Sequence, residues 1–68
     1  MNMPVKYLYM SGLQKKLGRS RSAIYKDIAA GRIPEPLRFG SKLMWRERDV
    51  DEHIQRLFED QAREKQRA

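Results

Sequence analysis

Gly18 stands between two segments in which an apolar residue recurs at i, i+4 spacing. The pairs are Leu13 with Leu17 and Ile24 with Ile28. Residues at this spacing lie on one face of a helix, so each segment predicts a short amphipathic helix. Glycine readily adopts the left-handed conformation that ends a helix, which predicts that the first helix stops at Gly18. About three residues then remain to join the two helices, which is the connection length of a helix-turn-helix.

Serine residues offer an N-cap to both helices. Ser11 is followed three positions later by Gln14, which is the spacing of a capping box, and Ser20 precedes the second helix. Gly31 is suited to end the second helix, because it tolerates a left-handed conformation. The sequence therefore predicts a first helix capped by Ser11 and a second helix that begins after Ser20 and ends near Gly31.

A small hairpin is expected after the second helix. Two prolines exclude helix from residues 33–36, and the segments LRF (37–39) and KLMW (42–45) lie on either side of a Gly-Ser pair. Alternation along these strands predicts that four apolar side chains pack on the helices: Leu37, Phe39, Leu43 and Trp45. Arg38 is expected to point outward, and Trp45 is interpreted as a core anchor rather than a base-stacking platform.

The two ends of the chain complete the expected fold. Residues 5–9 predict a short edge strand, and a third amphipathic helix is expected from about Glu47. Its apolar stripe consists of Val50, Ile54, Leu57 and Phe58. We expect a mainly α winged helix-turn-helix, three helices plus a β-hairpin wing, as one domain over residues 5–60. Residues 1–4 are expected to be disordered, and residues 61–68 to form a charged tail or an extension of the helix.

The composition excludes several kinds of functional site. The 68-residue chain has no cysteine and a single histidine, His53, so it offers neither a disulfide nor the ligands of a zinc site. It contains no paired acid and base, nucleophile motif or phosphate-cradling glycine loop. We therefore expect no enzyme activity, no cofactor and no metal, and we interpret His53 as structural. No apolar run approaches the roughly 20 residues of a membrane span, and residues at the N-terminus do not form the apolar stretch of a signal peptide. We therefore expect a cytoplasmic protein without a membrane partner.

Positive charge is concentrated in the first two-thirds of the chain. The net charge is +6, from 15 Lys and Arg against nine Asp and Glu. Residues 6–49 hold eleven of the basic residues and four of the acids, whereas residues 50–68 hold four basic residues and five acids. A surface of this sign favours a polyanion as partner, and its location assigns that surface to the helix-turn-helix and the hairpin.

The start of the second helix carries the residues best suited to contact DNA. The segment GRSRSAIYK spans residues 18–26, and its polar side chains lie away from Ile24 and Ile28. Such a face can enter the major groove of double-stranded DNA, where an arginine donates two hydrogen bonds to guanine O6 and N7. Arg21 is the preferred residue for a base contact, because its guanidinium can donate two hydrogen bonds to one base. Lys26 is better suited to phosphate, because its ammonium is a point charge on a flexible side chain. The candidate DNA contacts on this segment are Arg19, Arg21, Ser22, Tyr25 and Lys26.

The hairpin tip offers a second basic contact. Arg38, Ser41 and Lys42 surround Gly40, and such a tip can cross the phosphate backbone or enter the neighbouring minor groove. Contacts from a helix and a hairpin one groove apart would fix the angle at which the protein docks. The alternative for the residues of the second helix and of the hairpin tip is that they are ordinary polar side chains that face solvent. For Tyr25 the alternative is a packing role at the boundary of the core.

Residues 9–57 resemble the AlpA family of prophage regulators, within the wider group of MerR-like winged helices that includes phage excisionases. The resemblance is carried by SRSAIYK at 20–26, by GRIPEPLRFG at 31–40, and by Trp45 followed by the acidic start of the last helix. It implies that the first of these segments is the recognition helix and that the hairpin is the wing. It implies DNA-contact roles for Arg21, Ser22, Tyr25, Lys26, Arg38 and Lys42. Arg19 departs from the pattern, since such proteins usually carry a small apolar residue there, so either the core loses a contact or the turn rotates outward.

The resemblance implies a sequence-specific regulator of a prophage or mobile element that binds double-stranded DNA. Two roles stay open, control of transcription and action as an excisionase that bends attachment-site DNA. A lone small domain gains affinity by occupying adjacent sites, so we expect cooperative binding of further copies of the chain. The rival hypothesis is a protein-interaction module that recruits an acidic partner such as an integrase or an RNA polymerase subunit.

Overall fold

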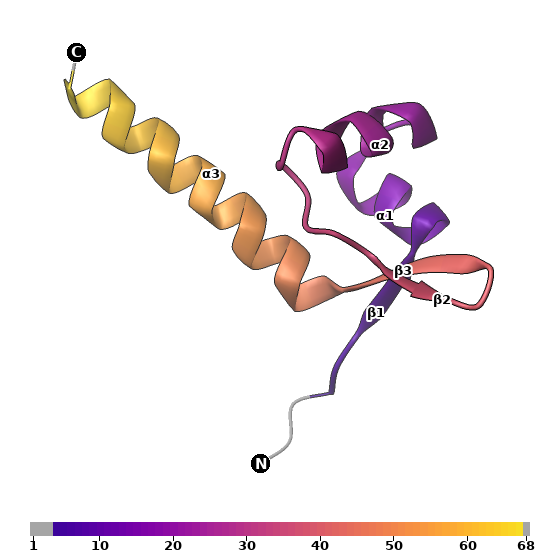
Figure 1. Cartoon of the computed structure of the whole chain (residues 1–68). Coiled ribbons are helices and arrows are strands. Elements are labelled where there is room, and N and C mark those ends of the chain that lie inside the picture. The colour runs from indigo at the N-terminus through magenta and orange to yellow at the C-terminus, as the bar shows by residue number, and fades with distance from the viewer. Residues whose placement is uncertain (1–3, 68) are drawn as a thin grey trace.

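A three-stranded antiparallel sheet carries two short helices on one side, and a long third helix leads away from it (Figure 1). The computed structural model describes residues 4–67. In chain order the elements are β1 (Tyr7–Tyr9), α1 (Met10–Leu17), α2 (Arg21–Ala29), β2 (Leu37–Phe39), β3 (Lys42–Arg46) and α3 (Glu47–Arg67). The predicted fold, mainly α with a small hairpin, is confirmed.

The expected edge strand and third helix are both present. β1 pairs with β3 at one edge of the sheet, whose strand order is β1-β3-β2. α3 begins at Glu47 as expected and continues through the charged segment to Arg67. The disorder expected for residues 1–4 falls outside the described residues except at Pro4, and Ala68 also lies outside them.

The register of the hairpin decides which side chains face the helices. The pairs are Leu37 with Met44, Arg38 with Leu43, and Phe39 with Lys42. Residues opposite each other in an antiparallel pair share a face. Trp45 is buried, so Leu43 and its partner Arg38 lie on the helix side. The prediction that Leu37 and Phe39 pack on the helices is therefore wrong, because they are 61% and 60% exposed on the other face.

The prediction that Arg38 points outward is wrong for the same reason. The two-residue turn at Gly40 and Ser41 places Phe39 opposite Lys42, so the two strands are offset by one residue from the arrangement that the alternation suggested. A shift of one residue moves every side chain of a strand to the opposite face. β1 follows the observed pattern, since Leu8 lies opposite Trp45 and is buried.

The core is small and centres on Trp45. Six hydrophobic side chains are buried: Leu8, Leu13, Ile24, Ile33, Trp45 and Val50. The indole is 3% exposed, and its Nε1 donates a hydrogen bond to the Pro34 carbonyl at 2.8 Å. A buried indole requires such an acceptor, so this bond ties the proline segment to the core. The prediction that Trp45 anchors the core is confirmed.

The ends of α1 and α2 follow three of the four predicted signals. Gly18 ends α1 with φ of 63°, and Gly31 follows α2 with φ of 81°. The Ser20 hydroxyl accepts a hydrogen bond from the backbone N–H of Ala23 at 3.2 Å, as an N-cap does. The N-cap predicted at Ser11 is wrong, because β1 leads directly into a helix that begins at Met10 and leaves Ser11 inside its first turn.

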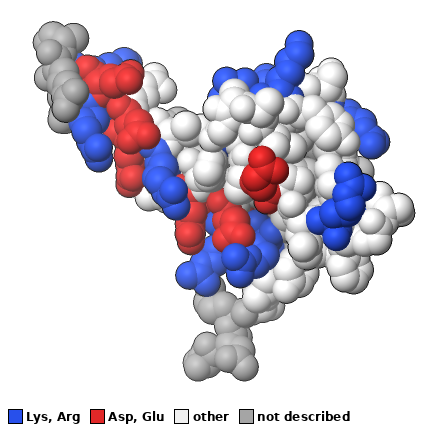
Figure 2. Space-filling view, in the orientation of Figure 1, with Lys and Arg blue, Asp and Glu red and all other residues white. Residues whose placement is uncertain are grey.

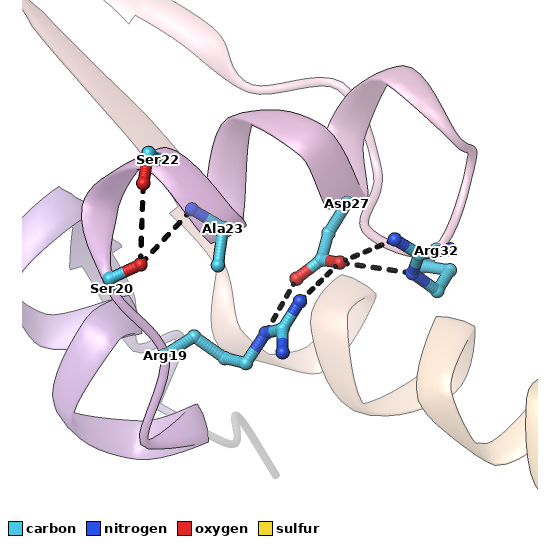
Figure 3. Close-up of polar contacts among 6 residues, drawn as sticks. All are labelled: Arg19, Ser20, Ser22, Ala23, Asp27 and Arg32. Carbon is cyan, nitrogen blue, oxygen red and sulfur yellow. Dashed lines mark hydrogen bonds and ion pairs between the residues drawn. The ribbon is translucent and has the colours of Figure 1, made fainter.

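A buried carboxylate links the two connections of α2 (Figure 3). Asp27, which is 4% exposed, accepts hydrogen bonds from Arg19 Nε at 3.0 Å and from Arg19 Nη2 at 2.9 Å. Arg32 Nε donates to Asp27 Oδ1 at 2.9 Å. Arg19 precedes α2 and Arg32 follows it, so one side chain fixes the turn before the helix and the loop after it. The Asp27 backbone carbonyl also accepts the Arg32 N–H at 2.8 Å.

α3 is attached to the body only over its first turns. Lys16 Nζ lies 2.8 Å from Glu47 Oε2 and 3.1 Å from Asp51 Oδ1, and these contacts, that with Glu47 above all, raise the pKa of Lys16. His53 Nε2 donates to the Gly31 carbonyl at 2.8 Å, because a carbonyl oxygen can only accept. Further along the helix, Phe58 is 70% exposed. The radius of gyration is 13.7 Å, against about 11 Å for a compact chain of this length.

Removal of the Asp27 carboxylate should destabilise the fold. Asp27→Ala leaves Arg19 and Arg32 without their shared acceptor, and both guanidinium groups are about half exposed. Because they can turn to solvent, we expect a loss of about 1–3 kcal/mol in the free energy of unfolding. Urea denaturation followed by the fluorescence of Trp45 measures this loss. Glu35→Ala is the control, because Glu35 is exposed and has no ion pair among the described residues; equal losses would contradict the role of Asp27.

The same carboxylate should make stability depend on pH in the acid range. Hydrogen bonds from Arg19 lower the pKa of Asp27 and Arg32 adds to the shift, although burial opposes it. A carboxyl with a lowered folded pKa stabilises the fold above its unfolded pKa of about 3.9, and this contribution is lost as the pH falls through the folded pKa. Below about pH 4 the wild type should therefore lose stability more steeply than Asp27→Asn in urea denaturation. Parallel pH curves for the two proteins would show that the charge of Asp27 is not stabilising.

Candidate nucleic-acid interface

The capped start of α2 presents one polar face to solvent. Ser20 caps the helix, while Ile24 and Asp27 hold its other side in the interior. The exposed side chains on the outer side are Arg21, Ser22, Tyr25 and Lys26. They lie in the first two turns, next to the unpaired N–H groups of the helix, where the helix dipole favours an anion.

Arg21 and Tyr25 lie together on this face. The Cζ atom of Arg21 is 5.9 Å from the centroid of the Tyr25 ring, within the range of a cation–π contact. Tyr25 is 44% exposed and Arg21 is also exposed, so both side chains remain accessible to a ligand. A cation–π contact leaves the N–H donors of the guanidinium available to another acceptor.

A hollow between α2 and the hairpin brings most of the candidate residues together. Its volume is about 450 Å³, and five of the eight residues selected from the sequence line it. They are Arg21, Tyr25, Arg38, Ser41 and Lys42. Arg38 reaches the hollow because the hairpin register turns it toward the helices. Ser22 and Lys26 are exposed on α2 but do not line the hollow.

Tyr9 is a residue of this hollow that the sequence analysis missed. The Nζ atom of Lys42 lies 5.2 Å from the centroid of the Tyr9 ring, and Tyr9 lines the hollow beside Met10 and Ser11. Tyr9 is in β1, far from Lys42 in the sequence, and the two meet because β1 pairs with β3. Only the register of the sheet could have revealed this contact.

Arg19 lies apart from the other candidate residues. Two of its guanidinium nitrogens donate to Asp27, and this contact raises the pKa of Arg19. The side chain of Arg19 is long enough to reach along α2 to the buried carboxylate (Figure 3). The turn at Gly18 therefore keeps the left-handed geometry that ends a helix. The departure of Arg19 from the family pattern thus has a structural explanation in its pairing with Asp27.

The charge of the interface differs from that of α3. Residues 4–46 carry ten Lys or Arg and two acids, whereas α3 carries five basic residues and seven acids. Of the two acids, Asp27 is neutralised by two arginines. On the face shown in Figure 2, the acidic side chains lie mainly along α3 and the basic ones also border the rest of the body. The hollow therefore belongs to the positive part of the molecule.

Among residues 4–67, no three His, Asp or Glu side chains gather in a way that could hold a metal ion. Over the same part of the chain, no helix has the length and apolar character needed to cross a membrane.

Comparison with known proteins identifies the family of the chain. No curated protein and no solved structure matches it. Residues 6–58 match the family model described as Prophage CP4-57 regulatory protein (AlpA). The matched range includes both helices of the helix-turn-helix, the hairpin and the first half of α3. The chain therefore belongs to the AlpA family of prophage regulatory proteins.

Proposed function

We propose that this AlpA-family protein binds double-stranded DNA sequence-specifically and regulates a prophage or mobile element through that binding. The observation that carries the proposal is the hollow in which α2 and the hairpin tip present Arg21, Arg38 and Lys42 together. Cationic side chains from two elements on one concave, positive surface fit a duplex whose charge repeats along two strands.

In the proposed complex α2 enters the major groove. Arg21 reads guanine through its two parallel donors, and the ring of Tyr25 restricts the positions its guanidinium can take. Ser22 and Lys26, on the outer side of the same helix, contact phosphate. The capped N-terminus of α2 adds its dipole to these contacts.

The hairpin tip crosses the adjacent phosphate backbone in this arrangement. Lys42, Ser41 and Arg38 supply the donors, and Tyr9 positions Lys42 through its ring. Arg19 acts on DNA only through Asp27, by holding the turn that sets the direction of α2. Candidate DNA contacts thus come from one helix and one hairpin, whose relative position the core determines.

The proposed docking serves either biological outcome, control of transcription or excision of the element. Both require a specific site and neighbouring proteins, for which further copies of this chain, an integrase or an RNA polymerase are the proposed partners. We propose that the chain has no catalytic activity of its own. A DNA-binding role assigns it to the cytoplasm.

Arg21 and Lys42 should affect DNA binding differently. Selection of bound duplexes from a random pool first supplies the preferred site, its half-site spacing and its symmetry. Arg21→Ala should then reduce discrimination between the preferred site and single-base variants by about 1–3 kcal/mol, since it removes a bidentate base contact. Lys42→Ala should weaken all duplexes to a similar extent, since it removes a phosphate contact.

Fluorescence anisotropy on matched and mismatched duplexes measures both effects. Arg56→Ala is the control, because Arg56 is an exposed arginine on α3. An equal loss of discrimination in the Arg21 and Lys42 variants would contradict the assigned roles.

Salt should weaken binding steeply if several of these cations contact phosphate. The slope of log K against log salt concentration is about −0.9 for each phosphate neutralised on duplex DNA, so Lys26→Ala and Lys42→Ala should each reduce the slope by about one. Titrations over a range of salt concentrations, with and without competitor duplex, measure the slope and the retained sequence preference. Finding no preference for one sequence would favour the rival role as a module that recruits an acidic protein.

A further inference from the structure

Phe39 is a large apolar side chain at the tip of the hairpin. It is the last residue of β2, directly before the turn at Gly40 and Ser41, and it is 60% exposed. Figure 1 shows this turn projecting from the body, on the side away from α3. The exposed rings of Tyr9 and Tyr25 carry hydroxyl groups and lie beside cations, whereas a phenyl ring has no polar atom to interact with water. Contact with a partner that covers Phe39 is therefore favourable.

The neighbours of Phe39 belong to the proposed DNA interface. Lys42 lies directly opposite Phe39 in the register, so the two side chains share one face of the hairpin. Lys42 also lines the basic hollow between α2 and the hairpin. Arg38, the residue before Phe39, and Ser41 in the turn line the same hollow. A phosphate backbone bound by these three residues therefore lies next to Phe39.

The charge next to the exposed apolar side chains of β2 changes along the strand. Leu37 is 61% exposed and lies on the same face as Phe39, two residues nearer the body. It lines a different hollow, of about 530 Å³, together with Glu35 and Asp49. Arg46 borders that hollow but is paired with Asp49 at 2.8 Å. Acidic side chains at this end of β2 disfavour phosphate, whereas the cations at the tip attract it. Of the two apolar side chains, Phe39 is the one placed to contact DNA.

We propose that Phe39 enters the minor groove next to the site of α2 and acts as a wedge, an apolar side chain that partly unstacks one base step. This inference rests on the proposed DNA-binding function, because Arg38, Ser41 and Lys42 bind the backbone at the tip. Apolar side chains inserted between base pairs from the minor groove, phenylalanine among them, kink the duplex by about 20–90° at that step. Binding of the chain therefore bends its DNA.

The width of the minor groove determines which part of the hairpin can enter it. The groove of B-DNA is about 6 Å wide. Two paired strands are already about 4.8 Å apart before their side chains are added, so the strands themselves do not fit side by side. The turn is narrower, because Gly40, with φ of 64°, adds no side chain. Phe39 is therefore the large side chain that reaches the bases, while the cations next to it hold the two backbones of the opened groove.

A wedge makes binding depend on base pairs that no polar side chain contacts. The free energy spent on unstacking is smallest at flexible pyrimidine–purine steps, TA and CA/TG, and at mismatched base pairs. A flexible step is therefore expected at a fixed distance from the bases that Arg21 contacts. Phe39 would select this step by its deformability, whereas Arg21 selects its base by hydrogen bonds.

The shape of the bound duplex tests the wedge. The duplex selected from a random pool carries a donor dye at one end and an acceptor dye at the other, and energy transfer is measured with saturating protein. Phe39→Ala removes the wedge, whereas Phe39→Leu keeps an apolar side chain of a kind that also serves as a wedge. Leu37→Ala is the matched control, since Leu37 is equally exposed on the same strand and face. Thermal melts and fluorescence anisotropy confirm that each variant is folded and bound.

We expect energy transfer to rise on binding of the wild type and of Leu37→Ala to the same extent. Phe39→Leu should keep most of this rise, and Phe39→Ala should lose most of it while still bound. In a second measurement a mismatch is placed in turn at each base step next to the bases that Arg21 contacts. At one of these steps the mismatch should tighten binding of the wild type several-fold and leave that of Phe39→Ala nearly unchanged, because the unstacking is already provided.

Three results would overturn the inference and leave the proposed function in place. The first is a wild-type complex without a bend. The second is a bend that Phe39→Ala retains in full, which would assign the exposed ring to a protein partner instead. The third is a loss of the bend in Leu37→Ala as large as that in Phe39→Ala, which would show that the change is not specific to the tip. Failure of the wild type to bind any duplex would refute the proposed function and the wedge together.

Discussion

The ion pair of Asp27 with Arg19 and Arg32 is the contact on which the placement of α2 depends. An ionised carboxylate in the interior costs several kcal/mol unless cations and hydrogen bonds compensate it. Here the compensating groups come from the turn before α2 and the loop after it. The carboxylate can therefore be buried only when both connections are in position. If the carboxylate were unpaired, the Ser20 cap and the hydrogen bond from His53 to the Gly31 carbonyl would remain, but the side-chain link between the two connections of α2 would be lost. The direction of the helix that carries Arg21 follows from this contact.

The helix-turn-helix could be predicted because its signals are local. Gly18 ends a helix by its backbone freedom and Ser20 begins one by its hydroxyl, and neither effect needs knowledge of the tertiary structure. Ser11 has the same chemistry as Ser20 and is not a cap, because the strand before it already determines where α1 begins. The charge of Arg19 favours a contact with DNA, whereas the position of its guanidinium depends on a buried partner eight residues away, Asp27. Tertiary contacts therefore decide which of several equivalent local signals is used.

The strand faces could not be predicted, because alternation identifies two faces without telling which of them is buried. The tight turn offsets the two strands of the hairpin by one residue. This offset turns Arg38 toward α2 and leaves Leu37 outside. The place of Arg38 in the basic hollow and the exposure of Leu37 on the apolar face thus follow from one register, and a change of the turn that shifted β2 by one residue would exchange them.

The attachments of α3 determine how these two surfaces relate to the end of the helix. Lys16 and His53 hold its first turns against α1 and against the end of α2, the element that carries the DNA-binding residues. Beyond them the helix has the rigidity of its own backbone hydrogen bonds and few contacts with the body. The exposed Phe58 is therefore held at a defined distance and direction from the hollow that contains Arg21. A flexible tail would reach many positions relative to α2, whereas a helix anchored in this way keeps its exposed end within few of them.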